Sequence, residues 1–346
     1  MTRTTLAASV LVFSALIFFL FLGRAHSQQL PPGVPIAPQN YLLPHFWGGG
    51  SPLSIDHWSL GSASVADSRA NWGANPACLV VATRPALESN GTVTKFTQLP
   101  TITLAVFAYE QPIDRKKPNG VLKIGLVTVR GSGALAGTPL SLNTREVDPS
   151  LEYGYRVTKT LALGAGLSYL ATKSDYLLPS GGVLTRLESR PSGFGGRLGA
   201  LYSPTSKLSV GGSLDTYGEK VQQSFPAIPF PIQKYQFHSS ATRIGVGAFP
   251  DSSTKLLLDY ESDKVSGAGF RTSRYAYEAG VEKSFGVKKF GVVTLRAGLF
   301  AGDLTGGIGL RYRGLEFSYG FSNKYAYMLP GEGAKTSQAI QVIAAL

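Results

Sequence analysis

The sequence has few of the residues that catalysis, metal binding and disulfide bonding require. Its single cysteine, Cys78, excludes an intrachain disulfide and a cysteine-based zinc site. The four histidines, at positions 26, 45, 57 and 238, show no metal-ligand spacing. The chain has no GxSxG motif and no P-loop, and GFGGRLG at 193–199 lacks the third glycine of a dinucleotide fingerprint. We therefore expect a protein that is not an enzyme and that uses no cofactor or metal; His238 is the remaining catalytic alternative.

Charged residues are also scarce, at 16% of the chain compared with about a quarter in typical soluble domains. Glycine is abundant, with 41 residues in a chain of 346, which favours many strands and turns. The formal net charge is +12 and falls to +10 without Arg3 and Arg24, which belong to the leader described next. Because the basic residues are scattered along the chain, the composition argues against nucleic-acid binding.

The first 27 residues predict a secretory signal peptide. Arg3 precedes an apolar run from Leu6 to Leu22, and small residues follow this run up to Ser27. Cleavage after Ser27 is the prediction. A retained membrane anchor is the alternative, because the run approaches the ~17 residues that a spanning helix needs.

Apolar and polar residues alternate strictly in many segments of the remaining chain. In TLALGAGLSYL, residues 160–170, one strand face would carry Leu163, Leu167 and Tyr169, and the other would carry Gly164 and Gly166. The same division occurs at 147–157, 207–217 and 314–322. Such alternation predicts half-buried strands. One face would meet lipid, and the inward glycines would either make room inside a barrel or mark bends in its wall.

Connections of two lengths alternate between the expected strands. The short ones lie at 156–160, 203–207, 249–255 and 313–314, and the long ones at 173–191, 219–235, 263–271 and 323–336. Outer-membrane barrels have short periplasmic turns and longer external loops. The alternation of short and long connections therefore predicts an outer-membrane barrel. In a soluble β-sandwich, no physical reason would sort the connections by length in this way.

The alternating segments predict a barrel of fourteen strands. They lie at 76–84, 100–110, 120–130, 146–157, 159–172, 192–203, 207–218, 236–249, 253–263, 272–284, 291–301, 306–313, 314–323 and 337–346. An even number is usual in single-chain bacterial barrels, and about 9 to 11 tilted residues cross a bilayer. The predicted fold class is all-β: a 14-stranded antiparallel transmembrane β-barrel.

Residues 28–75, between the leader and the first expected strand, do not alternate. Prolines at 31, 32, 35, 38 and 44 argue against regular structure there. A disordered linker is one interpretation, but Tyr41, Phe46, Trp47 and Trp58 are too apolar for a solvated tail. We predict an N-terminal hatch, or plug, inside the barrel. The predicted organisation is a signal peptide at 1–27, the hatch at 28–75 and the barrel at 76–346.

The stretch LGSASVADSRANWGANPACLVV, residues 60–81, resembles the start of the FadL-type outer-membrane transporters of long-chain fatty acids and other hydrophobic compounds. In that family an Asn-Pro-Ala box stands at the entry to the first strand; here the box is Asn75, Pro76 and Ala77. GFGGRLGALYSPTSKLSVGGSL and TRIGVGAFPDSSTKLLLDYESD resemble the family's pattern of strand, turn and strand. The resemblance implies fourteen strands, an N-terminal hatch held by the box, and transport.

Alternation also directs charged residues of both signs into the lumen. The arginines are Arg197, Arg243, Arg274, Arg296 and Arg311, and the near balance with acidic residues predicts cross-strand ion pairs that brace the wall or hold a plug. The alternative is that one or two of these arginines bind a ligand carboxylate, because a guanidinium can grip it bidentately.

The sequence thus predicts passive uptake of a hydrophobic small molecule across the bacterial outer membrane, with outer-membrane lipid around the barrel. Three alternatives remain open. The barrel could be a non-transporting partner of other envelope proteins in assembly or secretion, a general porin for polar solutes, or a secreted soluble β-protein with exposed aromatic faces. Ligand identity and oligomeric state are not indicated.

Overall fold

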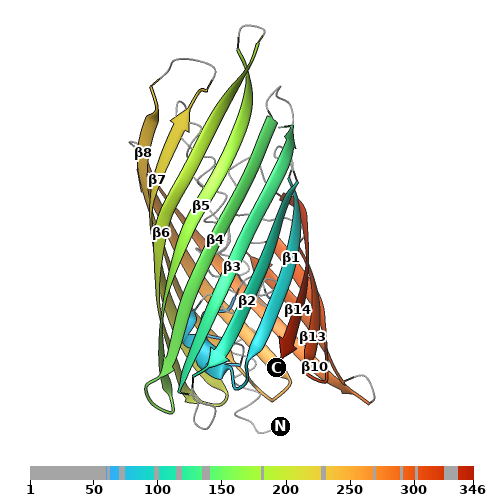
Figure 1. Ribbon diagram of the computed structural model, residues 1–346. Helices are drawn as coiled ribbons and strands as arrows, with labels where there is room; N and C mark the ends of the chain where they lie inside the picture. Colours follow the sequence, from blue (N-terminus) through green and yellow to red (C-terminus); the bar gives the residue numbers. More distant parts are fainter. Residues whose placement is uncertain are drawn as a thin grey trace.

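The computed structural model describes fourteen strands that form one closed antiparallel barrel (Figure 1). The described residues are 60, 63–69, 75–96, 101–113, 119–134, 141–180, 183–226, 231–267, 270–288, 291–300, 303–322 and 334–346. The strands are β1 Ala86–Phe96, β2 Ile102–Pro112, β3 Gly120–Ala134, β4 Ser141–Arg156, β5 Leu161–Ser180, β6 Val183–Thr205, β7 Leu208–Ser224, β8 Gln233–Ala248, β9 Thr254–Gly267, β10 Phe270–Val287, β11 Gly291–Phe300, β12 Asp303–Tyr312, β13 Leu315–Ser322 and β14 Ala334–Ala345.

Each strand pairs with the next one along the chain, and β1 pairs with β14 to close the barrel. The closing register begins at Ala86 opposite Ala345 and includes Asn90 opposite Gln341. Because the barrel is closed, the backbone N–H and C=O groups of β1 and β14 form hydrogen bonds with each other, and neither strand is a free edge. The predicted strand number and antiparallel order are confirmed.

The two faces of the wall differ as the alternation predicts. On β5, Leu163 and Leu167 are 46% and 70% exposed on the outward face, whereas Ala162 and Leu170 are buried on the inward face. Along β7 the burial alternates residue by residue over most of the strand. Large apolar side chains therefore cover the outside of the barrel, and the inside has most of the polar and small residues together with some apolar ones.

The first strand differs from the prediction. Residues Pro76–Val81 form a 3-10 helix, η1, and not part of a strand at 76–84. The wall begins at Ala86, in a strand that the sequence pattern did not predict. The sequence PACLVV is apolar at almost every position, so it can be buried on all sides, as a lumenal element is. Within the described residues, no helix is long and apolar enough to cross a membrane.

The short connections are confirmed, but two of the long ones are almost entirely strand, and a third, 219–235, is shortened by β7 and β8 to 225–232. β5 and β6 extend to Ser180 and from Val183, and β9 and β10 are separated only by 268–269. The expected loops at 173–191 and 263–271 are therefore hairpins that extend the wall. Residues 157–160, 206–207, 249–253 and 313–314 make short turns at the opposite end.

Two prolines interrupt the pairing on either side of β5. The β4–β5 ladder has a gap at Asp148 and Pro149, and the β5–β6 ladder has a gap at Arg190 and Pro191. Proline has no N–H to donate to its neighbour. The register is the same before and after each gap, so the strands stay aligned across it.

Candidate functional site

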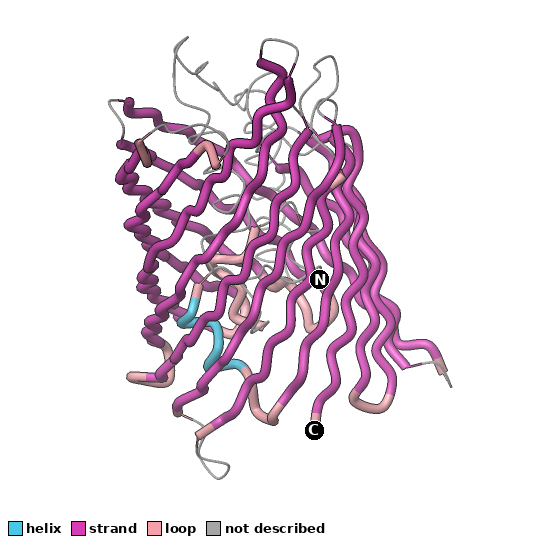
Figure 2. Tube along the Cα trace, turned by 45° about the horizontal axis from the view of Figure 1, so that its top comes forward, coloured by secondary structure: helices cyan, strands magenta, loops and turns pink. Residues whose placement is uncertain are grey.

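Part of the chain that precedes the wall lies inside the barrel. We call residues 60, 63–69 and 75–82 the inner segment. Leu60, Ser64, Val65 and Asp67 have no exposed surface. Leu60 packs with Ala63 against Leu257 on β9 and Phe249 in the β8–β9 turn. Figure 2 shows η1 within the ring of strands, toward the end where the chain terminates. The inner segment thus lies across the lumen near that end.

Inward glycines of the wall make room for the inner segment. A Cβ atom at Gly211 on β7 would collide with the Val65 carbonyl, and one at Gly199 on β6 would collide with the Asn75 side chain. Gly164 on β5 and Gly280 on β10 face Pro76 and Leu60 in the same way. Gly166, in contrast, faces the Glu152 side chain. For Gly164, the space-making interpretation is therefore correct, because its backbone touches another segment.

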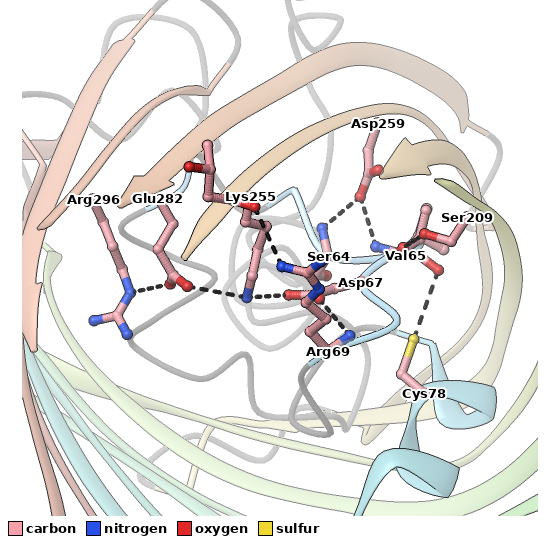
Figure 3. Close-up of polar contacts among 12 residues, drawn as sticks. Ser64, Val65, Asp67, Arg69, Cys78, Ser209, Lys255, Asp259, Glu282 and Arg296 are labelled. Atoms are coloured by element: carbon pink, nitrogen blue, oxygen red, sulfur yellow. Dashed lines mark hydrogen bonds and ion pairs between the residues drawn. The ribbon is translucent and has the colours of Figure 1, made fainter. Parts of the chain in front are cut away.

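Asp259 on β9 binds the backbone of the inner segment. Its Oδ2 accepts hydrogen bonds from the N–H groups of Ser64, at 2.6 Å, and Val65, at 2.8 Å (Figure 3). Both N–H groups are buried, and without this carboxylate they would lose these hydrogen bonds inside the barrel. On β7, the Ser209 hydroxyl donates to the carbonyl of Ala66.

A chain of ion pairs ties the inner segment to three neighbouring strands, β9, β10 and β11. Lys255 Nζ on β9 lies 2.6 Å from Asp67 Oδ2 and 3.6 Å from Glu282 Oε1 on β10. Glu282 in turn accepts from Arg296 Nε on β11 at 2.8 Å (Figure 3). All of these side chains are at most 13% exposed, so the pairs are largely screened from solvent.

Arg69 holds the segment at the short-turn end. Its Nη1 donates to the carbonyl of Asp251 at 2.7 Å, and its guanidinium stacks over the Phe249 ring at 4.4 Å. Asp251 lies in the β8–β9 turn, where hydrogen bonds from Ser253 and Thr254 hold the pKa of its carboxyl well below the ordinary value. The inner segment is therefore attached to a turn that is itself hydrogen-bonded.

The Asn-Pro-Ala box starts η1. Asn75 caps the helix, because its Oδ1 accepts a hydrogen bond from the Ala77 N–H at 3.0 Å. Pro76 occupies the first helical position, where the backbone N–H that proline lacks would have no partner within the helix. The Asn75 Nδ2 also donates to the carbonyls of Val65 and Ala200, each at 2.8 Å. A single side chain thus joins both parts of the inner segment to β6.

Cys78 lies in the interior formed by η1, β5 and β6. It is fully buried in a cluster with Val80, Ala162 and Leu201. Burial, with the nearby Asp67 carboxylate as a smaller cause, raises the pKa of the Cys78 thiol well above its ordinary value. The thiol is therefore protonated and unreactive while the segment stays in place.

A second set of ion pairs forms a belt around part of the wall, with alternating sign. Glu152 on β4 lies 3.8 Å from Lys123 on β3 and 3.0 Å from Arg197 on β6. Arg197 also pairs with Asp215 on β7. The belt continues through Arg243 on β8, which is paired with Asp215 and with Glu261 on β9 at 2.5 Å each. The predicted cross-strand bracing is present at these positions.

Three of the five arginines predicted to lie in the lumen do so in the structure. Arg197, Arg243 and Arg296 point inward, and each is paired with two carboxylates. Arg311 is exposed beside the turn to β13, and the side chain of Arg274 lies outside the described residues. The aromatic hatch residues Tyr41, Phe46, Trp47 and Trp58 also lie outside them.

The residues that bind the inner segment were mostly missed. Lys255 and Glu282 alternate in phase with other inward residues, so the strand pattern could have placed them in the lumen. Their pairing with Asp67 could not have been found in this way, because it joins a residue outside any strand to the wall. Within the described residues, no group of histidines, cysteines and acids could hold a metal ion.

Apolar side chains form two inward patches. Leu104 and Val106 on β2 lie opposite Val129 and Val127 on β3. A second patch, at the loop-bearing ends of β7 to β9, is a cluster of Val221, Phe237 and Val265. The side chains of both patches are at most 8% exposed, so the barrel interior is apolar at these places although many of its other residues are polar.

Structure comparison finds barrels of the same fold. The chain is similar to the CymD monoaromatic hydrocarbon channel, with a TM-score of 0.59, 14% identity, and coverage of 87% of this chain and 98% of that one. It is also similar to the P. putida toluene transporter TodX (TM-score 0.57, 12% identity, coverage 86% and 99%) and to a Pseudomonas aeruginosa FadL homologue (0.57, 11%, 86% and 99%). No protein-family model and no curated protein sequence matches the chain.

Proposed function

We propose that this protein is an outer-membrane channel for the passive uptake of hydrophobic compounds, and that its N-terminal part is the hatch. The closed barrel with an apolar outer face supports membrane insertion. The likeness in fold to CymD, TodX and the FadL homologue supports transport of hydrophobic compounds. The end with short turns is then periplasmic, and the end with long connections external.

The inner segment is the observation that carries this proposal. A general porin keeps an aqueous lumen, whereas here the wall has glycines, Asp259 and Lys255 placed to bind a segment across it. Tyr41, Phe46, Trp47 and Trp58, upstream of this segment, would add apolar surface to the same hatch.

The charges inside the barrel favour a neutral compound over a carboxylate. Arg197, Arg243 and Arg296 are each paired with two carboxylates of the wall, so a fatty acid would have to compete with both. The apolar patches around Val106 and Phe237 need no charged ligand. The ligand class we propose is small, uncharged hydrophobic compounds, of which the toluene of TodX and the aromatics of CymD are examples.

Uptake by cells that carry the barrel tests the proposal. We expect cells with the full chain to take up radiolabelled toluene faster than cells with an empty vector, without dependence on metabolic energy. Dodecanoate is the matched carboxylate probe and should enter at the control rate. Faster entry of dodecanoate alone would reverse the ligand assignment. Unchanged entry of both probes would contradict transport and favour a role as an assembly or secretion partner.

A further inference from the structure

Three basic side chains lie directly opposite one another on neighbouring strands at the outer face of the barrel. Arg130 on β3 pairs in register with Arg145 on β4, and Arg145 pairs with Lys173 on β5. These strands lie side by side at the front of Figure 1. Neighbouring strands are about 4.7 to 4.9 Å apart, so the three cations form one row. We call these three residues the basic row.

The basic row points away from the lumen. All three side chains are exposed, and the residues that alternate with them, Val129 and Glu146, are buried in the interior. Arg190 extends the row onto β6, because the pairs on either side of the ladder gap set it across from Lys173. Arg190 differs from the others in that Glu188 on its own strand binds it at 2.9 Å.

The carboxylates near the basic row are paired with other arginines: Asp175, two residues beyond Lys173 on β5, binds Arg186, and Glu188 on β6 binds Arg186 and Arg190. Among the described residues, none forms an ion pair with Arg130, Arg145 or Lys173. Like charges directly opposite each other on adjacent strands destabilise a sheet. The arrangement therefore favours an anion from outside the chain, and phosphate suits it because arginine grips its oxygens in a fork.

Apolar surface adjoins the basic row on the side toward the middle of the wall. Val147, next in outward alternation on β4, is 47% exposed. Below it on β5 and β6, Leu167 and Phe194 are 70% and 73% exposed, and the Phe194 ring lies 4.9 Å from that of Tyr169. A ligand with a phosphate head and acyl chains would meet cations first and an apolar wall next.

The direction of the strands gives the side of the membrane. β3 begins at Gly120, at the short-turn end, and Arg130 lies ten residues further along it, near the long-connection end. Lys173 lies in the part of β5 that extends toward Ser180 at the same end. The basic row thus stands at the external boundary of the apolar belt.

We propose that the basic row binds the phosphate groups of a glycolipid in the outer leaflet of the outer membrane, with the acyl chains lying on the apolar wall below. The proposal rests on the outer-membrane placement in the proposed function, and not on which compound passes through the lumen. Its test is independent of transport, because a barrel that carries nothing could still bind this lipid.

The test compares melting temperatures of the full chain in neutral detergent with and without diphosphoryl lipid A. The variant R130Q/R145Q/K173Q removes the basic row. The matched control, K95Q/K220Q/K264Q, removes the same charge from exposed positions whose register partners are uncharged. We expect lipid A to raise the melting temperature of the wild type and the control but not of the row variant. Each lost cation should weaken binding about fivefold.

Two further results separate the basic row from general electrostatics. Without lipid, the row variant should melt no lower than the wild type, since the substitution relieves repulsion between like charges. Phosphatidylglycerol and inorganic phosphate should stabilise all three proteins equally or not at all. Equal stabilisation of both triple variants by lipid A would overturn the proposal. A response of the wild type to phosphatidylglycerol or phosphate as large as that to lipid A would overturn the assignment to a glycolipid.

Discussion

Glycine has a specific use in this barrel, because the inner segment lies directly on the wall where side chains are missing. Gly211, Gly199 and Gly164 sit on three consecutive strands and face Val65, Asn75 and Pro76. Their inward direction was predictable from alternation. Their contacts were not predictable from alternation. Gly199 and Gly211 touch a segment more than a hundred residues away in sequence, and only this contact shows that they make room and do not mark a bend.

A methyl group at Gly211 should displace the inner segment. In Gly211→Ala, the added Cβ would collide with the Val65 carbonyl, which is backbone and cannot rotate away. We expect Cys78, the only cysteine of the chain, to react with a maleimide several times faster than in the wild type. Gly91→Ala is the matched control, because a Cβ there meets nothing within 4 Å. If both variants label at the wild-type rate, the glycine contact does not position the segment.

Among the secondary-structure elements, a strand could be predicted from the sequence where one of its two faces is clearly apolar. β7 and β13 alternate almost without exception. β13 was predicted close to its observed bounds, whereas β7 was predicted only as far as residue 218 and continues to Ser224. β1, ALESNGTVTKF, was missed because Ser89, Gly91 and Lys95 interrupt its outward apolar face. The parts of β5 and β6 beyond Thr172 and before Pro191 were taken for loops because charged residues such as Lys173 and Arg186 interrupt the outward apolar face, although Tyr176 and Leu187 are buried on the inward face.

η1 illustrates why the hatch attachment could be predicted only in part. The resemblance indicated that Asn75, Pro76 and Ala77 matter, but the expected strand at 76–84 is wrong. The cap hydrogen bond from the Ala77 N–H to Asn75 and the fit of Cys78 against Ala162 make a helical turn more favourable there. The cap is encoded locally by Asn75 and Pro76. The packing of Cys78 comes from Ala162 on β5 and Leu201 on β6, and local sequence does not encode it.

The Asp67–Lys255 pair should contribute measurably to holding the inner segment. Removing one partner of a buried pair leaves an uncompensated charge and typically costs about 3 to 5 kcal/mol. We therefore expect K255Q and D67N each to raise the rate of Cys78 labelling by local opening, by a factor between about a hundred and a few thousand.

The double variant D67N/K255Q is the control for this prediction. It removes both charges, so its labelling rate should fall below that of either single variant. If the increase in labelling rate in the double variant equals the product of the increases in the two single variants, Asp67 and Lys255 do not act as a pair. Lys283→Gln, at an exposed pair with Asp251, should leave labelling unchanged.

At the scale of the whole molecule, the barrel separates its interactions by side. The outer face has apolar side chains and, at one boundary, the basic row. The inner face has alternating ion pairs, and the inner segment is attached to β6, β7, β9 and the β8–β9 turn. Since attachment points of this segment are spread over several strands, no single substitution is expected to open the lumen completely.

The most direct test of a hatched channel is single-channel conductance of refolded residues 28–346, which lack the predicted signal peptide, in a planar bilayer. We predict that this protein stays closed or conducts only briefly. A variant without residues 28–74 should show large steady openings, because only residues 75–82 of the inner segment remain in its lumen. A deletion variant that remains as silent as the full chain would mean that this segment does not block the lumen. Large steady openings of the intact protein would contradict the hatch and indicate a porin.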